Sequence, residues 1–177
     1  MREDTEYLAD AAVDAAMDRK LRALLSTCFT KPQDKVFETR RYFTEPPAHR
    51  WIIRDENGDL AAHIAVHEKH VVSDAGVHRI AGIAEVCVHP KTRGLGHVKG
   101  ILGCVHDWAS SRGFVFAVLF GDPRVYRSSG YVETGNLVYE GTGPDGNAVR
   151  TSVPAMVRPL GDRPWPSGEV YLPGPVF

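Results

Sequence analysis

The sequence lacks two features that would have pointed to a nucleic-acid or a membrane partner. It has no basic surplus, since 21 Lys and Arg residues stand against 22 Asp and Glu residues, and the formal net charge is −1. Nucleic-acid-binding surfaces normally have an excess of positive charge, so we expect no nucleic-acid partner. No apolar run approaches the ~20 residues that a membrane-spanning helix needs, so we expect no membrane partner.

Cysteine is also scarce, and its three positions follow no metal-ligand spacing. Cys28, Cys87 and Cys104 lie far apart in the sequence, within apolar runs. An odd number of such residues is typical of reduced, buried thiols, which predicts a cytoplasmic protein. The acidic start, MREDTEYLADAA, resembles neither a signal peptide nor a transit peptide.

The length and composition are those of one globular domain. The chain has 177 residues, of which 43% are hydrophobic and 24% are charged. We therefore expect a single domain over residues 1–177. From Gly161 the sequence is rich in proline and glycine, so residues 161–177 are expected to form an extended tail without regular structure.

Apolar periodicity predicts helices and strands in a definite order. Three- and four-residue steps and helix-ending residues predict helices over residues 8–29, 34–43, 98–109 and 124–129. Alternating or continuous apolar runs predict strands over residues 50–54, 60–67, 80–88, 114–120, 131–139 and 155–160. Turn residues cluster at 56–59, 73–76 and 141–147. The expected fold class is α/β (α+β), with a mixed, mainly antiparallel central sheet flanked by helices and a crossover at residues 80–120.

The helix expected from residue 98 has no capping side chain at its start. Where Ser, Thr, Asp or Asn usually stands, the sequence has Gly94, Leu95 and Gly96. A helix start leaves main-chain N–H groups unpaired and has a partial positive charge from its dipole. Because glycine lets the main chain approach a ligand closely, residues 93–98 predict an anion site, with Lys91, Arg93 and Lys99 adding positive charge around it.

Two familiar phosphate-binding loops do not match this segment. A P-loop ends in Gly-Lys-Ser/Thr, whereas this chain has Lys99-Gly100-Ile101 and no hydroxyl for magnesium. A dinucleotide-binding loop needs G-x-G-x-x-G and an acid after the next strand, and neither is present. The pyrophosphate of coenzyme A remains as a ligand, and so does the alternative of an ordinary glycine-rich corner with surface lysines.

Two motifs resemble the GNAT superfamily of N-acetyltransferases. Its Arg/Gln-x-x-Gly-x-Gly/Ala signature at a strand-to-helix turn is matched by residues 93–98, Arg-Gly-Leu-Gly-His-Val, with Val98 in place of the usual small residue. A second signature, an aromatic residue followed after three positions by Gly and another aromatic, is matched by Tyr126, Gly130 and Tyr131. The resemblance covers roughly residues 8–160. The tail is weakly similar to the ends of nodulation N-acyltransferases and aminoglycoside 2′-N-acetyltransferases.

The resemblance implies a co-substrate, a set of binding residues and an acid. It implies acetyl-CoA without a metal, and a dimer is one state that family members often adopt. The strand before the loop would bind the pantetheine arm with its main chain, and the N–H of Val88 would donate to the thioester oxygen. Tyr126 would protonate the departing thiolate, the alternative being an aromatic residue that only packs the short helix. The cofactor-binding residues implied are Val86, Cys87, Val88, Arg93, Gly94, Leu95, Gly96, His97 and Val98.

Glu85 is the candidate general base. It is a carboxylate inside an otherwise apolar strand, IAGIAEVCV. Burial there would raise its pKa and suit it to accept a proton from an ammonium group, directly or through water. The alternative is a structural acid paired with an arginine.

The histidines and Cys87 predict neither a metal site nor a nucleophile. His63 and His67 lie four residues apart on a strand, ~13 Å between Cα atoms, and therefore cannot share one ion. We expect both on the polar or substrate-facing side of that strand, with an ordinary surface role favoured. A Cys–His–Glu triad of Cys87, His89 and Glu85 is disfavoured, because the anion loop would then have no purpose.

The sequence as a whole favours an acetyl-CoA-dependent N-acetyltransferase that acts on a small-molecule primary amine by direct transfer. Two alternatives stay open: an N-acyltransferase with a longer acyl donor, and a module that binds acyl-CoA without catalysis. No residue of the sequence identifies the acceptor amine.

Overall fold

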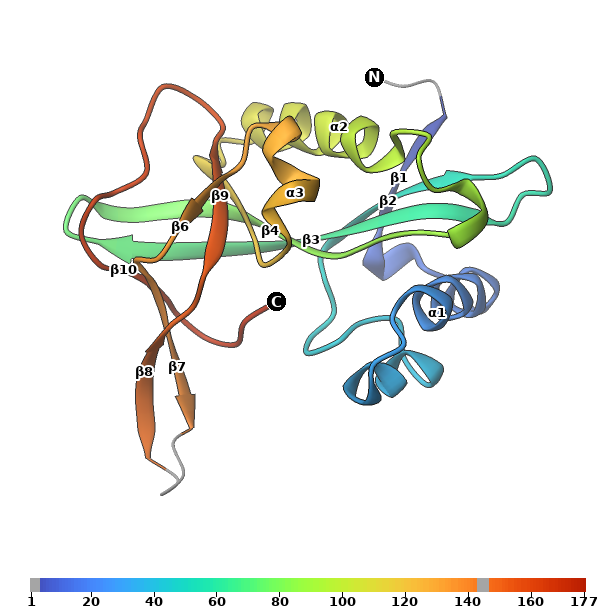
Figure 1. Cartoon of the computed structure of the whole chain (residues 1–177), viewed down its shortest axis with the longest axis horizontal. Coiled ribbons are helices and arrows are strands. Elements are labelled where there is room, and N and C mark those ends of the chain that lie inside the picture. The colour runs from blue at the N-terminus through green and yellow to red at the C-terminus, as the bar shows by residue number, and fades with distance from the viewer. Residues whose placement is uncertain (1–3, 143–146) are drawn as a thin grey trace. The chain divides into compact units, whose positions relative to one another are not determined.

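The computed structural model describes residues 4–142 and 147–177, and these divide into two compact units. Unit 1 comprises residues 1–67 and 83–107, and unit 2 comprises residues 68–82 and 108–177. Figure 1 shows two long strands, β3 (Leu60–Ser73) and β4 (Gly76–Val88), and the helix α2 (His97–Ser111). Each of these three elements contributes residues to both units. The single domain expected from the length stays a prediction.

Unit 1 consists of helices and antiparallel strands from the first half of the chain. Besides its parts of β3, β4 and α2, it contains β1 (Thr5–Ala9), η1 (Asp10–Ala12), α1 (Ala15–Cys28), η2 (Pro32–Glu38), β2 (His49–Arg54) and η3 (Pro90–Thr92). Strand β2 pairs antiparallel with both β1 and β3, and β3 neighbours β4. The predicted meander over residues 50–88 is therefore confirmed.

Helix α1 begins later than the sequence predicts. The carboxylate of Asp14 accepts a hydrogen bond from the main-chain N–H of Met17 at 2.7 Å and thereby caps the helix. Residues 5–9, partly included in the predicted helix, instead pair with β2. One face of α1 packs into a buried core, whose members are Leu21, Leu24, Leu25, Phe37, Ile52, Leu60 and Cys87.

The helix predicted over residues 34–43 is a short 3₁₀ segment, η2. It begins at Pro32, where a missing N–H costs nothing, and ends at Glu38. The N–H of Thr39 closes it on the carbonyl oxygen of Val36 at 3.2 Å. The following residues are therefore free to form the loop that passes Glu85.

Unit 2 is mainly a sheet. Its own elements are β5 (Phe116–Leu119), α3 (Pro123–Tyr126), η4 (Arg127–Ser129), β6 (Val132–Thr134), β7 (Leu137–Thr142), β8 (Ala148–Ser152), β9 (Ala155–Pro159) and β10 (Val170–Leu172). The strand order is β6-β9-β5-β4-β3-β10-β7-β8. Strand β9 pairs antiparallel with β5 and β6, and β10 runs parallel to β7. The expected mixed, mainly antiparallel sheet with helices is confirmed.

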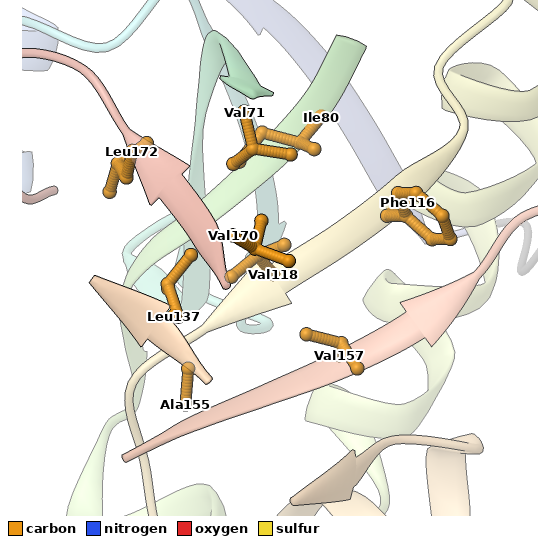
Figure 2. Packing of buried hydrophobic residues seen from close by; sticks show 9 residues of the cluster. All are labelled: Val71, Ile80, Phe116, Val118, Leu137, Ala155, Val157, Val170 and Leu172. Carbon is orange, nitrogen blue, oxygen red and sulfur yellow. The ribbon is translucent and has the colours of Figure 1, made fainter. Parts of the chain in front are cut away.

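A second apolar core fills unit 2 (Figure 2). Side chains from β5, β9 and β10 meet those from β3, β4 and β7 in it, and all are at most 3% exposed. Its buried members are Val71, Ile80, Phe116, Val118, Leu137, Ala155, Val157, Val170 and Leu172. Most of the continuous apolar run at residues 114–120 is thus buried as predicted, and Val115 and Phe120 are partly buried.

Two predictions for unit 2 are wrong in part. The strand expected over residues 131–139 is two strands, β6 and β7, separated at Gly135 and Asn136. The tail is not coil throughout, because β10 pairs with β7 and β3 and buries Val170 and Leu172. The turn expected at residues 141–147 lies mostly outside the described residues.

Candidate functional site

Glu85 interrupts strand β4 with a left-handed main-chain conformation. Its φ is 51°, and among the described residues it is the only one other than glycine with a positive φ. Residues with a Cβ rarely adopt this region, and they do so mainly where surrounding contacts hold them. Such a bend inside a strand points to a local function.

The Glu85 side chain is enclosed, at 5% exposed. Its Oε1 accepts a hydrogen bond from the main-chain N–H of Phe43 at 2.8 Å, and its Oε2 lies 3.4 Å from Nη1 of Arg50. Burial raises the pKa of Glu85 to about 7, against the opposing attraction of the Arg50 cation. The arginine partner expected of a structural acid is therefore present, and so is the raised pKa expected of a base.

Arg50 is fully buried and has four partners. Its Nε donates to Oδ1 of Asp10 at 2.7 Å, and its Nη2 donates to the carbonyl oxygen of Arg41 at 2.9 Å. Its Nη1 faces both Glu85 and His63. Burial alone would raise the pKa of Asp10, but hydrogen bonds from Arg41 and Arg50 outweigh it and lower that pKa. Asp10 therefore stays ionised and balances the charge of Arg50.

His63 and His67, two of the three histidines of β3, are buried, so the expectation of surface roles is wrong. His63 is 0% and His67 is 4% exposed. His63 Nε2 lies 2.9 Å from Nη1 of Arg50, and His63 Nδ1 lies 3.0 Å from the carbonyl oxygen of Glu85. His67 Nδ1 lies 3.8 Å from the carboxylate of Glu45. Strand β3 is covered on the face that these side chains occupy.

The main-chain N–H and C=O groups of Val88, the last residue of β4, point away from β3. The N–H of the next residue, His89, donates to the carbonyl oxygen of Ala61 on β3 at 2.8 Å. Since successive residues of a strand direct their N–H and C=O groups to opposite edges, Val88 directs its own to the other edge. Its carbonyl oxygen accepts there from Cys28 Sγ at 3.3 Å and from Arg93 Nε at 3.4 Å.

Residues 93–97 lead from this point into helix α2 through two left-handed glycines. Gly94 has a φ of 81° and Gly96 a φ of 76°, which explains why glycine stands at both positions. In the part of the chain that the structure describes, the first main-chain N–H of α2 with a protein acceptor is that of Gly100, bonded to Gly96 O at 3.0 Å. The amides ahead of it stay available to an anion.

The residues around this helix start fit a pyrophosphate. Lys91, Arg93 and Lys99 are exposed and provide positive charge. Nδ1 of His97 is buried and has no hydrogen-bond partner among the described residues. The open amides and the exposed cations together can hold an anion such as a diphosphate.

Cys87 has a structural place beside this site. Its side chain packs into the core under α1 and contacts Cys28. The hydrogen bond with Cys28 and burial raise the pKa of Cys87, so its thiol stays protonated, which argues against the Cys87–His89–Glu85 triad. The same hydrogen bond and the nearby Arg93 lower the pKa of Cys28 to about 7, against its burial.

Tyr126 belongs to unit 2 and ends helix α3. Its ring is 9% exposed and packs edge-on against the ring of Tyr131, with centroids 6.1 Å apart. A Cβ added to Gly121 would lie 2.5 Å from the Tyr126 ring, so glycine is required there. The packing predicted as the alternative role of Tyr126 is thus present, and its role as an acid stays a prediction.

Three residues around Glu85 were not identified from the sequence as part of its environment. Asp10, Arg50 and His63 lie 22 to 75 positions from Glu85, and no short motif joins them. Cys28, which contacts Val88 from 60 positions away, was missed as well. Arg50 stands on the same face of β2 as the buried Ile52. This alternation was the one signal in the sequence that the Arg50 side chain is directed into the interior.

Neither a metal group nor a membrane span is found in the described chain. Over residues 4–142 and 147–177, no three His, Cys, Asp or Glu side chains are grouped so that they could hold a metal ion. Within the same residues, no helix has the length and apolar character needed to cross a bilayer.

Comparison with known proteins identifies one family. The family described as "Acetyltransferase (GNAT) domain" matches residues 12–133, more than half of the chain. No curated protein matches the sequence.

Several solved structures are similar to this chain in fold. A GNAT family N-acetyltransferase, YhbS, from Escherichia coli, crystallised in complex with CoA, has a TM-score of 0.65 at 18% identity, covering 96% of this chain and 89% of its own. Escherichia coli ElaA has a TM-score of 0.60 at 15% identity, covering 87% and 97%. The ribosomal-protein-S18-alanine N-acetyltransferase from Escherichia coli has a TM-score of 0.55 at 16% identity, covering 90% and 96%. At these identities the likeness concerns the fold.

Proposed function

Because the chain belongs to the GNAT acetyltransferase family, we propose that it transfers an acetyl group from acetyl-CoA to the primary amine of a small molecule. The amine attacks directly within a ternary complex, and no acyl-enzyme forms. The protein acts in the cytoplasm, without a nucleic-acid or membrane partner.

The proposal depends most on Glu85. A primary amine near pH 7 is mostly an ammonium ion, which has no lone pair with which to attack a thioester. A carboxylate with a pKa of about 7 accepts and releases a proton in that pH range, unlike an ordinary glutamate. Glu85 takes the proton of the ammonium, directly or through water.

The segment after Glu85 is proposed to hold the acyl donor. Acetyl-CoA supplies a thioester whose carbonyl carbon accepts the amine. The main chain of Val86, Cys87 and Val88 binds the pantetheine arm, and the Val88 N–H donates to the thioester oxygen as charge develops on it. The amides and side chains of residues 93–98 bind the pyrophosphate.

Tyr126 is proposed as the acid that protonates the leaving thiolate. The resemblance of residues 126–131 to the second family motif supports this role, and so does the hydroxyl as a donor of suitable type. Its conservative variant, Tyr126→Phe, keeps the ring that packs on Tyr131 and removes only the hydroxyl.

The donor and the acceptor define the first experiment. Release of free thiol from acetyl-CoA is measured with a panel of aminoglycosides, polyamines, amino sugars and peptide N-termini. Turnover with at least one amine, lowered at least 100-fold by Glu85→Gln, is the expected result. Turnover that Glu85→Gln leaves unchanged would remove Glu85 from its role.

Calorimetric titration distinguishes the two alternatives. Binding of acetyl-CoA with micromolar affinity supports the proposal, whereas indifference to acetyl-CoA together with tight binding of a long-chain acyl-CoA favours the longer donor. Tight binding of acetyl-CoA without turnover of any amine favours a module that binds and does not catalyse.

A further inference from the structure

Arg50 and His63 hold Glu85 at both its side chain and its main chain. Nη1 of Arg50 lies 3.4 Å from Oε2 of Glu85 and 2.9 Å from Nε2 of His63. The other ring nitrogen of His63, Nδ1, lies 3.0 Å from the carbonyl oxygen of Glu85. The three residues therefore form a closed ring of contacts, to which β2, β3 and β4 each contribute one member.

The hydrogen bonds of this ring have a fixed direction. A guanidinium group has donors and no acceptor, so Nε2 of His63 accepts from Arg50 and does not carry a proton. The proton of the neutral ring is then on Nδ1, which donates to the carbonyl oxygen of Glu85. Burial and the Arg50 cation lower the pKa of His63 to about 3, so the ring stays neutral wherever the protein works.

The bond to the Glu85 carbonyl oxygen stabilises an unfavourable main chain. A glutamate has no intrinsic preference for a φ of 51°, because its Cβ crowds the carbonyl oxygen there. A fixed donor on the neighbouring strand ties this carbonyl oxygen in place. The side chain is then directed toward Arg50 and the N–H of Phe43.

We infer that Arg50 and His63 are positioning residues for the Glu85 base, with His63 holding the main chain of the bend and Arg50 holding the carboxylate. The inference rests on the proposed function, since it assigns both residues to that site. Neither residue transfers a proton. Arg50 is itself fixed by Asp10 and by the carbonyl oxygen of Arg41, so its charge cannot turn away from Glu85.

The charged and titratable groups around Glu85 decide its pH response. They are Arg50 from β2, Asp10 from η1, His63 from β3 and Cys87 from β4 itself. His63 and Cys87 are neutral near pH 7, and Asp10 is ionised and bonded to Arg50 and Arg41. Arg50 is therefore the one group in this set that favours the charged form of Glu85.

Two substitutions of His63 separate its two hydrogen bonds. In His63→Asn the amide nitrogen takes the place of Nδ1 and keeps the bond to the Glu85 carbonyl oxygen. In His63→Gln the amide oxygen takes the place of Nε2 and keeps the bond to Arg50. If His63 acts through the bend, kcat falls at least fivefold further in His63→Gln than in His63→Asn, and KM for acetyl-CoA stays within twofold.

His70→Gln is the matched control, since His70 is exposed on the same strand. It should leave kcat and KM unchanged. Equal loss of kcat in the two His63 variants, or a larger loss in His63→Asn, would overturn the inference. A thermal melt of each variant establishes that the comparison is made on folded protein.

The role of Arg50 is tested on the carboxyl group itself. The Glu85 carboxyl carbon is followed by NMR titration of ¹³C-glutamate-labelled protein, assigned with Glu85→Gln. Arg50→Met should move the titration midpoint of Glu85 at least one pH unit upward, and the acidic limb of kcat/KM should move with it. If Arg50→Met does not fold, Arg50→Lys keeps a charge of one and should lower kcat without that upward shift.

These readouts separate the inference from the proposed function. If the wild-type protein acetylates no amine, the proposed function fails, while the NMR titration still decides whether Arg50 holds the Glu85 carboxylate. If the wild-type protein is active but the midpoint of Glu85 is unmoved in Arg50→Met, the positioning role fails and the proposed function stands.

Discussion

Sγ of Cys28, the last residue of α1, lies 3.3 Å from the carbonyl oxygen of Val88, the last residue of β4. The two residues are 60 positions apart in the sequence. The contact places a half-buried thiol next to the main chain that we propose binds the thioester. It also brings Cys28 beside Cys87 and near Arg93.

Cys28 should therefore be the most reactive of the three cysteines. The hydrogen bond with Cys87 and the nearby Arg93 lower the pKa of Cys28 to about 7, whereas the pKa of Cys87 is raised and Cys104 is buried. Iodoacetamide at pH 7.5 should modify Cys28 first, as mapped by mass spectrometry. The adduct should weaken CoA binding at least tenfold in calorimetry.

Cys28→Ser should bind CoA normally and should keep that affinity after treatment with iodoacetamide. Cys104→Ser is the matched control, and its CoA affinity should still fall after the same treatment. First modification at Cys104, or a fully alkylated Cys28 without loss of CoA affinity, would contradict the assignment.

Glu85→Gln should change how stability depends on pH. The pKa of Glu85 is about 7 in the folded protein and 4.5 as its ordinary value, so the folded state binds the proton more tightly. The stabilising contribution is full below pH 4.5 and is lost as the pH rises through about 7. Above pH 7 the variant, which cannot ionise, should gain up to about 3 kcal/mol relative to the wild type.

Urea denaturation at pH 5 and pH 8 measures this difference. Glu56→Gln, in the exposed turn before β3, is the control and should show no such trend. A stability difference between wild type and Glu85→Gln that is the same at both pH values would mean that the pKa of Glu85 is ordinary.

Gly96→Val should abolish the anion site. The left-handed φ of 76° is unfavourable for a residue with a Cβ by roughly 1–2 kcal/mol, so the loop should reorganise and its amides should turn away. The dissociation constant for CoA should rise at least tenfold in calorimetry.

Gly103→Ala is the matched control, because a Cβ at this position of α2 meets no atom within 4 Å. It should stabilise the protein by roughly 0.5–1 kcal/mol through helix propensity and leave CoA binding unchanged. Normal CoA affinity in Gly96→Val would refute the proposed pyrophosphate site.

Two arginines of β2 should differ sharply in their effect on stability. Arg50 is fully buried and bonded to Asp10, so Arg50→Met leaves a buried carboxylate with fewer partners and should cost about 3–5 kcal/mol. Arg54 pairs with Glu6, and the two side chains are 33% and 50% exposed, so Arg54→Met should cost about 0–1 kcal/mol. Urea denaturation at pH 7 compares them, and similar costs would show that the buried network contributes little.

Local signals in the sequence were enough to predict many of the helices, strands and turns that carry the site. The absence of Ser, Thr, Asp or Asn ahead of residue 98, where Gly94 and Gly96 stand instead, predicted an uncapped helix start. The apolar steps over residues 98–109 predicted α2, and the alternation over residues 50–88 predicted the meander. These features depend on residues within a few positions of one another.

Short strands escaped prediction for a physical reason. Strands β1 and β10 have five and three residues, and each exists because another strand offers hydrogen bonds to it. Their sequences have no stable conformation of their own, since an isolated strand pairs with nothing. Proline and glycine in the tail suggested coil, and the buried Val170 and Leu172 outweighed that local preference.

The sequence by itself determined the family, the order of the main elements and the glycine turn, because each is encoded by spacing along the chain. Only the tertiary structure decided what surrounds Glu85. Its bend, the ring formed with Arg50 and His63, and the charge of Asp10 join residues 13 to 75 positions apart. Burial among these groups moves the pKa of Glu85, and burial is a property of the folded molecule.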